Sequence, residues 1–235
     1  MNIALFFIAA AAGYLISSIN PAIVLSKLIY HKDIRNEGSG NPGFTNFKRV
    51  FGSKYAWVVF VLDISKALVL EIIFGFLFQK YTGQRQLGIA FTGLFAMFGH
   101  AYPIWYKFEG GKAFLVVITT LYMVSWKAGL IATAVLALFL FTTHYMSLST
   151  ILALLAGSLS LFLFTAEYTG NSANKTDYFI TIGIMIFSAL FVALRHKENI
   201  KNLIAGTERK FYFKSKKKEE SKENPVEVQK TTTEQ

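Results

Sequence analysis

The chain has 235 residues, of which 53% are hydrophobic, 16% aromatic and only 16% charged. A soluble domain of average composition carries about 25% charged residues; the low share here comes from long uncharged runs, which excludes an ordinary soluble globular protein. The absence of cysteine excludes a cysteine nucleophile, a thiolate metal site and a disulfide. The formal net charge is +10. Its basic residues are dense from Arg195 onward, where they would face an anionic membrane surface rather than nucleic acid.

Seven apolar segments predict the fold. A helix needs about 20 apolar residues to cross a hydrocarbon core of roughly 30 Å, and no alternation with period 2 suggests a barrel. The segments are residues 3–28, 55–79, 87–106, 112–126, 128–143, 147–165 and 178–195. The fourth and fifth are short and meet at Ser125-Trp126-Lys127, so the sequence is compatible with five to seven crossings. We therefore predict an all-α, polytopic integral membrane helical bundle with about seven transmembrane helices.

Basic residues near the segment ends predict the orientation. They are dense in the connections after the first and third segments and after the last, and sparser on the other side of the bundle. Because cytoplasmic loops carry an excess of Lys and Arg, we predict that the N-terminus lies outside the cell and the C-terminus in the cytoplasm. No basic residue precedes Lys27, so the first segment is expected to be an uncleaved helix rather than a signal peptide.

The composition divides the chain into two parts. Residues 1–210 hold the apolar segments and their connections, and they are predicted to form one membrane-embedded domain. Residues 211–235 are rich in Lys, Glu, Asn, Pro, Gln and Thr and cannot bury a core. We expect this second part to be a disordered, basic and polar cytoplasmic tail.

Three polar segments lie on the predicted cytoplasmic side. The first is Gly38-Ser-Gly-Asn-Pro-Gly-Phe-Thr-Asn46, followed by Arg49. Closely spaced glycines allow backbone N–H groups to converge on an anion, and a helix that starts near Thr45 would add its N-terminus. The segment therefore predicts a phosphate-binding loop, and the alternative is a glycine-rich turn between two helices.

The second polar segment runs from His100 to Lys112. Its aromatic residues suit the membrane interface. Gly110-Gly111-Lys112 is similar to the end of a phosphate loop, although the pattern GxxxxGK[ST] is not satisfied. Lys112 is interpreted either as an anion ligand or as a flanking lysine whose ammonium group reaches the surface.

The third polar segment is Arg195-His-Lys-Glu-Asn199, followed by Gly206-Thr-Glu208. His196 and Asn199 are three residues apart and would share a helix face. They form either part of a site or an ordinary polar helix end. The four histidines of the chain are scattered without a recurring ligand spacing, so no metal site is expected.

Two further sets of polar residues are noted outside these segments. Asp63 and Lys66 lie within the second apolar segment at a spacing that allows an ion pair. They are interpreted as a structural pair or as support for the phosphate loops. Ser147 and Ser149 follow His144, and they either add hydroxyl groups to the site or are ordinary serines at a helix end.

Taken together, the three segments resemble the signature blocks of the bacterial PlsY family of acyl-phosphate:glycerol-3-phosphate acyltransferases. The residues that carry the resemblance are Gly38 to Asn46 with Arg49, Gly99-His-Ala-Tyr-Pro103 with Gly110-Gly-Lys112, and Arg195-His-Lys-Glu-Asn-Ile200 with Gly206-Thr-Glu208. The blocks occur in the family's order, between the corresponding apolar segments, and the resemblance covers about residues 1–210.

The resemblance implies transfer of a fatty acyl group from acyl phosphate to the sn-1 hydroxyl of glycerol 3-phosphate. The products would be 1-acylglycerol 3-phosphate (lysophosphatidic acid) and phosphate, in phospholipid synthesis. It also implies a multi-pass protein of the bacterial plasma (inner) membrane, with the active site on the cytoplasmic face. The implied partners are the two substrates, membrane lipid and, as a candidate, the enzyme that produces the acyl phosphate. No cofactor and no nucleic acid are implied.

The resemblance also implies roles for individual residues. The expected catalytic residues are Ser39, Asn41, His196 and Asn199. The expected substrate-binding residues are Gly38, Gly40, Thr45, Asn46, Arg49, Gly110, Gly111, Lys112 and Ser149. On this hypothesis the first block holds the acyl-phosphate head group, and Arg49, Lys112 and Ser149 bind glycerol 3-phosphate. His196 and Asn199 then orient the acceptor hydroxyl or take its proton, and a substrate phosphate can share that role.

Four positions depart from the family's pattern. Ala113 and Ala67 stand where members usually have glycine, and His144 and Asn202 stand where arginine is common. Alanine is unfavourable where φ is positive, and lost arginines would weaken anion binding. Two other functions therefore stay open: a membrane transporter of small organic phosphates, and a catalytically reduced paralogue that binds lipid phosphate. The transporter is less favoured because the polar segments gather at one face rather than near the midplane.

Overall fold

Helices account for all the regular secondary structure in the part of the chain that the computed structural model describes, residues 2–169 and 175–212. The α-helices are α1 (Ile3–Ser17), α2 (Pro21–Tyr30), α3 (Phe44–Phe51), α4 (Ser53–Thr82), α5 (Arg85–Ala101), α6 (Phe114–Val124), α7 (Trp126–Thr143), α8 (Met146–Ser160), α9 (Thr165–Thr169), α10 (Lys175–Arg195) and α11 (Lys197–Ile204). Three short 3-10 helices lie between them: η1 (Ile34–Asn36), η2 (Ile104–Tyr106) and η3 (Leu161–Phe164). The predicted all-α fold is confirmed.

Five helical segments are long and apolar enough to cross a membrane. They are Ile3–Tyr30, Arg85–Tyr106, Trp126–Thr143, Met146–Tyr168 and Lys175–Arg195. Helix α4 has 30 residues and is about 45 Å long, but it carries Asp63, Lys66 and Glu71. Helix α6 has only 11 residues and is about 16 Å long, too short to cross a core of roughly 30 Å alone. The chain is a multi-pass membrane protein, and its orientation and number of full crossings remain predictions.

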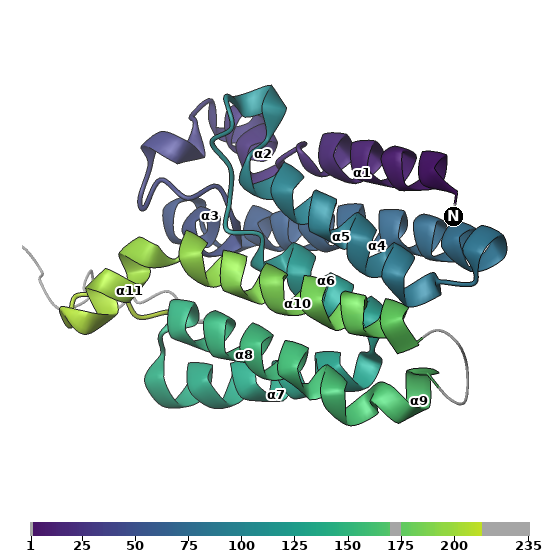
Figure 1. Ribbon diagram of the computed structural model, residues 1–235. Helices are drawn as coiled ribbons and strands as arrows, with labels where there is room; N and C mark the ends of the chain where they lie inside the picture. The colour runs from purple at the N-terminus through teal and green to yellow at the C-terminus, as the bar shows by residue number, and fades with distance from the viewer. Residues whose placement is uncertain (1, 170–174, 213–235) are drawn as a thin grey trace, which may run out of the picture.

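The long helices lie side by side along one direction (Figure 1). Helix α5 packs against α1, α4, α6 and α10, and α7 packs against α8. The largest apolar cluster surrounds α6 and includes Met97, Leu121, Leu154 and Met185, each fully buried. Large apolar side chains on the outer helix faces are exposed, as expected for helices in contact with lipid.

The first apolar segment differs from the prediction, because it forms two helices rather than one. The break falls at residues 18–20, where Asn20 caps α2: its Oδ1 accepts a hydrogen bond from Ile23 N at 3.1 Å, and Pro21 opens the helix. The Nδ2 atom of Asn20 donates to the carbonyl oxygen of Pro42 at 3.2 Å. The break therefore ties the start of α2 to the glycine-rich loop that precedes α3.

The fourth and fifth apolar segments are two helices, α6 and α7, with Ser125 alone between them. Ser125 Oγ accepts a hydrogen bond from Ala128 N at 3.4 Å and so caps α7. Helix α6 ends where α7 starts. With 11 residues against 18 in α7, it is about 10 Å shorter than α7.

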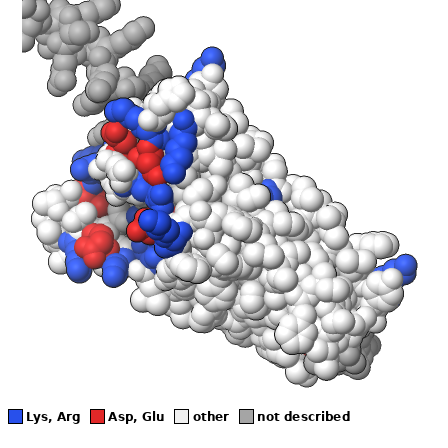
Figure 2. All heavy atoms as spheres, turned by 90° about the horizontal axis from the view of Figure 1, so that it is seen from above, with Lys and Arg blue, Asp and Glu red and all other residues white. Residues whose placement is uncertain are grey.

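Charged side chains gather at one end of the molecule, the end that carries α2, α3 and α11 in Figure 1, and they leave most of the visible long face uncharged (Figure 2). Arg35 links the connection between α2 and α3 to the connection between α5 and α6. Its guanidinium contacts Asp33 in the first at 2.8 Å and Glu109 in the second at 3.0 Å. The Arg35 guanidinium holds the pKa of Asp33 well below its ordinary value. All three polar segments of the sequence meet at this end.

Candidate active site

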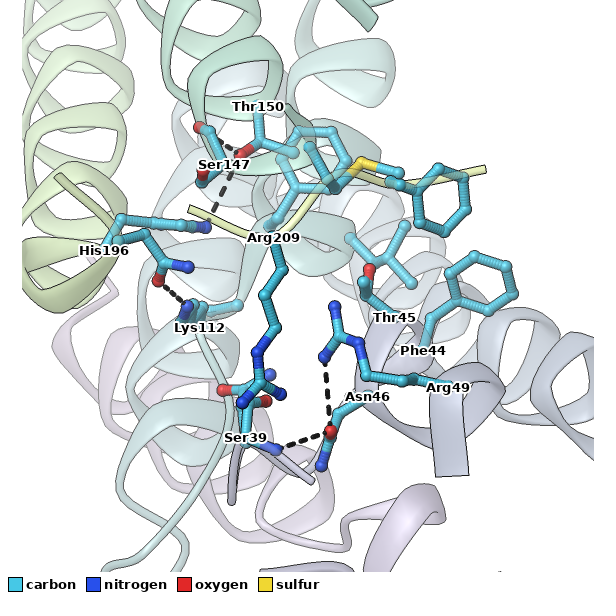
Figure 3. A pocket seen from close by; sticks show the side chains of 18 of the residues that line it. Ser39, Phe44, Thr45, Asn46, Arg49, Lys112, Ser147, Thr150, His196 and Arg209 are labelled. Carbon is cyan, nitrogen blue, oxygen red and sulfur yellow. Dashed lines mark hydrogen bonds between the residues drawn. The ribbon is translucent and has the colours of Figure 1, made fainter. Parts of the chain in front are cut away.

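A pocket of about 600 Å³ opens among the three polar segments. Ten of its lining residues are labelled in Figure 3. Eight of the expected site residues line it: Ser39, Asn41, Thr45, Asn46, Arg49, Lys112, His196 and Asn199. Gly38, Gly40, Gly110, Gly111 and Ser149 do not line it. The pocket therefore unites residues from three parts of the chain up to 160 positions apart, from Ser39 to Asn199.

The first loop is shaped by two glycines and one asparagine. Gly38 and Gly40 have φ values of +63° and +71°, which residues other than glycine rarely adopt. Asn46 is buried, its Oδ1 accepts from Ser39 N at 2.9 Å, and its Nδ2 donates to Glu37 O at 2.9 Å. Asn46 thus holds the loop in shape, while Ser39 and Asn41 present their side chains to the pocket.

The second loop brings Lys112 into the pocket. Gly111 N donates to the carbonyl oxygen of His100 at 3.1 Å, and Arg195 Nη2 lies 3.2 Å from both the Gly110 and Gly111 carbonyl oxygens. A Cβ atom at Gly110 would collide with the backbone of His100, and one at Gly111 would collide with the His100 ring. The two glycines act as packing residues that let the loop lie directly on the end of α5.

Lys112 lies in an unusual environment for a lysine. Burial is the main cause that lowers its pKa to about 8; the charge of Glu208 opposes this shift, and the cations Arg195 and Arg49 add to it. Its Nζ contacts Asn199 Oδ1. The next residue, Ala113, has a φ of +61°, a left-handed conformation that alanine rarely adopts.

Asp63, Lys66 and His100 form a buried cluster behind the second loop. Lys66 Nζ lies 2.9 Å from Asp63 Oδ1 and 3.0 Å from His100 Nδ1, and His100 Nδ1 lies 3.3 Å from Asp63 Oδ1. The expected ion pair between Asp63 and Lys66 is present. Because it also contacts the histidine that supports Gly111, the pair braces the loop that carries Lys112.

The third segment places His196 at the junction of α10 and α11. Its Nδ1 lies 2.8 Å from the Val192 carbonyl oxygen, its Nε2 lies 3.5 Å from Thr150 Oγ1, and the ring is 6% exposed. Burial, together with the charge of Lys112, lowers the pKa of His196 to about 4. The ring is therefore neutral at pH 7.

Residues 207–212, which we call the C-terminal strap, cross the pocket after α11. Glu208 Oε1 accepts hydrogen bonds from Ser147 Oγ and Asn199 Nδ2, both at 2.7 Å. Phe211 N donates to the His144 carbonyl oxygen at 2.8 Å, and the Phe211 ring is 7% exposed and lies near Phe44 of α3. Phe211 and Tyr212, the first residues of the expected tail, are thus part of the packed structure. The rest of the tail, residues 213–235, lies outside the described residues.

Sequence reasoning placed Ser149 in the site and did not name Thr150 or Arg209. Ser149 is fully buried and donates to the Tyr145 carbonyl oxygen at 2.8 Å, whereas its helix neighbours Ser147 and Thr150 line the pocket. Arg209 also lines the pocket and was not predicted, although it directly follows the motif Gly206-Thr-Glu208. Asn202, one of the departures from the family's pattern, lines the pocket as well.

The apolar part of the pocket faces the membrane-spanning part of the bundle. It is formed by side chains of α3, α4, α6, α7 and α8, among them Phe44, Trp57, Phe60, Leu136 and Leu140. The pocket thus joins a cationic, donor-rich end to an apolar end, which suits an amphiphilic molecule with an anionic head. Within the described ranges, no group of three His, Cys, Asp or Glu side chains is arranged to hold a metal ion.

Comparison with known proteins identifies the family of this chain. Residues 7–206 match the sequence profile of the family described as glycerol-3-phosphate acyltransferase. A glycerol-3-phosphate acyltransferase of Mycoplasmopsis synoviae (strain 53) is 36% identical over 221 residues, covering 91% of this chain and 96% of the relative. One from Thermoanaerobacter pseudethanolicus is 38% identical over 201 residues, covering 86% and 93%.

Two crystal structures of PlsY, described as an integral membrane glycerol 3-phosphate acyltransferase, have a similar fold. The glycerol 3-phosphate form matches with a TM-score of 0.75 at 31% identity, covering 88% of this chain and 96% of that protein. The lysophosphatidic acid form matches with a TM-score of 0.71 at 31% identity, covering 88% and 95%.

Proposed function

This chain belongs to the glycerol-3-phosphate acyltransferase family, and from that premise we propose that it transfers a fatty acyl group from acyl phosphate to the sn-1 hydroxyl of glycerol 3-phosphate. The products are 1-acylglycerol 3-phosphate and inorganic phosphate. The chain is an acyltransferase of the membrane-integral type, as its relatives and its helical bundle show. The choice of donor and the roles of individual residues are our proposal.

The observation that carries this proposal is the two-sided character of the pocket. Arg49 and Lys112 supply positive charge at its polar end, and Trp57 and Leu136 belong to its apolar end. An acyl phosphate has an anionic head on a long apolar chain, so it matches both ends at once. Glycerol 3-phosphate is small and wholly polar, and it matches the polar end alone.

The chemistry needs no nucleophile from the protein. Acyl phosphate is an activated mixed anhydride, so the acceptor oxygen attacks the acyl carbon, the bond from that carbon to the phosphate oxygen breaks, and phosphate leaves with the electron pair. The protein has to hold the two substrates in line and stabilise the charge that develops on the leaving phosphate. Cations and hydrogen-bond donors placed before the reaction suit that task.

We assign the first loop, with Ser39 and Asn41, to the head of the acyl phosphate. Arg49 and Lys112 are assigned to the phosphate of glycerol 3-phosphate. Ser149, which does not line the pocket, is replaced in this role by Ser147 and Thr150. Thr45 remains a candidate for either phosphate, whereas Asn46 and the four glycines act through the shape of their loops.

His196 is assigned to the acceptor hydroxyl. The Val192 carbonyl oxygen can only accept, so Nδ1 of His196 carries the proton and Nε2 of the neutral ring keeps a lone pair. That lone pair can accept the hydroxyl proton as the new ester bond forms, and a substrate phosphate can share this role. Asn199, which contacts Lys112, orients the same hydroxyl.

The charged end of the bundle is assigned to the cytoplasmic face of the bacterial plasma membrane. The excess of basic residues in its connections supports this orientation. An active site on that face can receive glycerol 3-phosphate from the cytoplasm, and it can receive acyl phosphate from the enzyme that makes it.

The test is an assay of phosphate release by the purified protein in detergent or lipidic mesophase. Palmitoyl phosphate is supplied with and without glycerol 3-phosphate. We expect release that depends on the acceptor and is lost in Asn41→Ala and His196→Ala. If folded wild-type protein releases no phosphate in the presence of both substrates, the proposed reaction is wrong. Binding of glycerol 3-phosphate without turnover would then favour the reduced paralogue, and movement of label into sealed vesicles would favour the transporter.

A further inference from the structure

Arg209 is a pocket residue whose position is fixed by its neighbours in the chain. On one side Glu208 is held by Ser147 and Asn199, each at 2.7 Å. On the other side Phe211 is pinned by the His144 carbonyl oxygen and buried near Phe44. The backbone of Arg209 thus lies between two anchored residues, Glu208 and Phe211.

The side chain of Arg209 points into the pocket. Figure 3 shows it extending from the Thr150 side toward Ser39, with the guanidinium of Arg49 beside its own. Arg209 takes part in no ion pair or hydrogen bond with a side chain of the described residues. Its charge acts on Arg49: burial is the main cause that lowers the pKa of Arg49, and Arg209 lowers it further.

Two neighbouring guanidinium groups in one pocket repel each other. Glu208 is the nearby acid: its charge opposes the effect of Arg209 on Arg49, and its Oε1 accepts hydrogen bonds from Ser147 and Asn199. Arg49, Arg209 and Lys112 all line the pocket, so one carboxylate does not balance these cations, and an anion between the two arginines is favourable. A phosphate dianion supplies two charges and enough acceptor oxygens for two guanidiniums.

We propose that Arg209 binds the phosphate of glycerol 3-phosphate together with Arg49, as an acceptor-binding residue contributed by the C-terminal strap. This inference rests on the proposed function and names a further ligand for the acceptor. Glycerol 3-phosphate has no apolar part, so its affinity depends on ionic contacts. Acyl phosphate, by contrast, is also held by its chain in the apolar end of the pocket. Arg209 is exposed, as suits a residue that meets a substrate arriving from water.

The strap supplies a matched control. Lys210 is adjacent to Arg209, carries the same charge and is also exposed, but it does not line the pocket. Arg209→Gln and Lys210→Gln therefore remove the same charge from the same segment. Only the first removes it from the pocket. Arg209→Lys keeps the charge and loses the planar, two-pronged geometry.

The experiment measures KM for each substrate in these three variants, with palmitoyl phosphate as donor. Loss of one charge-assisted contact raises a dissociation constant by about 10-fold to 100-fold. We expect Arg209→Gln to raise KM for glycerol 3-phosphate by that factor and to leave KM for palmitoyl phosphate within about twofold. Arg209→Lys should lie between Arg209→Gln and the wild type, and Lys210→Gln should behave as the wild type.

Three results would overturn the proposal. They are an unchanged KM for glycerol 3-phosphate in Arg209→Gln, a rise in KM for palmitoyl phosphate instead, and equal effects of Arg209→Gln and Lys210→Gln. If the wild type shows no acceptor-dependent turnover, the proposed function fails separately. Titration of glycerol 3-phosphate into wild type and Arg209→Gln by calorimetry then decides the role of Arg209: weaker binding in the variant supports it, and equal binding overturns it.

Discussion

The carbonyl oxygen of Val192 lies 2.8 Å from Nδ1 of His196, one helical turn further along the chain. This contact fixes the proton on Nδ1 and leaves Nε2 as the acceptor on the pocket side. With a pKa of about 4, the ring stays neutral from pH 5 to pH 8. Nε2 of His196 thus carries no proton throughout the physiological range.

His196→Ala should lower kcat by about 100-fold to 10,000-fold, because a positioned general base contributes about that much. KM for glycerol 3-phosphate should change much less, since the phosphate contacts remain. His31→Asn is the control, because His31 is an exposed residue that ends α2 in a left-handed conformation, which asparagine tolerates. Steady-state phosphate release checks both variants, and full activity of His196→Ala would contradict the assignment.

The activity should fall at alkaline pH because of Lys112. Its pKa of about 8 lies below the ordinary value of 10.5, so the cation is present below pH 8 and is lost as the pH rises above it. We expect kcat/KM for glycerol 3-phosphate to fall by about tenfold per pH unit above pH 8. Lys112→Arg should be less active at pH 7 but should lose this alkaline fall, since its guanidinium stays charged. A wild-type profile that is flat to pH 10 would contradict the prediction.

Gly111→Ala should damage the site through the position of Lys112. The added Cβ has no room beside the His100 ring, so the loop that carries Lys112 must move. We expect a rise in KM for glycerol 3-phosphate of about tenfold or more, comparable to the loss of one charge-assisted contact. Gly183→Ala in α10 is the matched control, because a Cβ there meets open space. If the two variants have equal kinetics, the close packing of this loop is not needed for binding.

Ser147 and Ser149 should differ in their effect on activity. Ser147 lines the pocket and donates to Glu208, whereas Ser149 donates to a backbone carbonyl within its own helix. Ser147→Ala should lower kcat/KM by about 5-fold to 30-fold, the loss expected for a hydrogen bond of about 1 to 2 kcal/mol to a charged group. Ser149→Ala should stay within about twofold of the wild type. The reverse order of effects, measured under the same conditions, would restore Ser149 as a ligand.

The fold class and eight of the residues that line the pocket followed from the sequence, for local reasons. Segments long enough to span a bilayer can be recognised as uninterrupted runs of apolar residues. The glycines of residues 38–43 likewise predict a tight loop before Arg49. The break before α2 also had a local signal, since Asn20-Pro21 is a typical helix start. The length of the apolar run concealed it.

The remaining features depend on contacts between distant parts of the chain. Arg209 reaches the pocket because Phe211 is buried near Phe44, more than 160 positions earlier, and no local pattern contains that information. Ser147 rather than Ser149 lines the pocket because of the rotation of α8 about its axis. A shift of one or two residues on a helix turns a side chain toward or away from a neighbour.

The shortness of α6 has a consequence for how the enzyme meets its donor. Helices α6 and α7 share one end at Ser125, and α7 has 18 residues against 11 in α6, so α6 begins about 10 Å short of the length of α7. Under the proposed function, we infer that a donor anchored in the leaflet reaches the pocket beside the start of α6 without leaving the lipid. Under the proposed function, the rate then depends on the mole fraction of acyl phosphate in the membrane, and diluting it with inert lipid slows the reaction at constant bulk concentration.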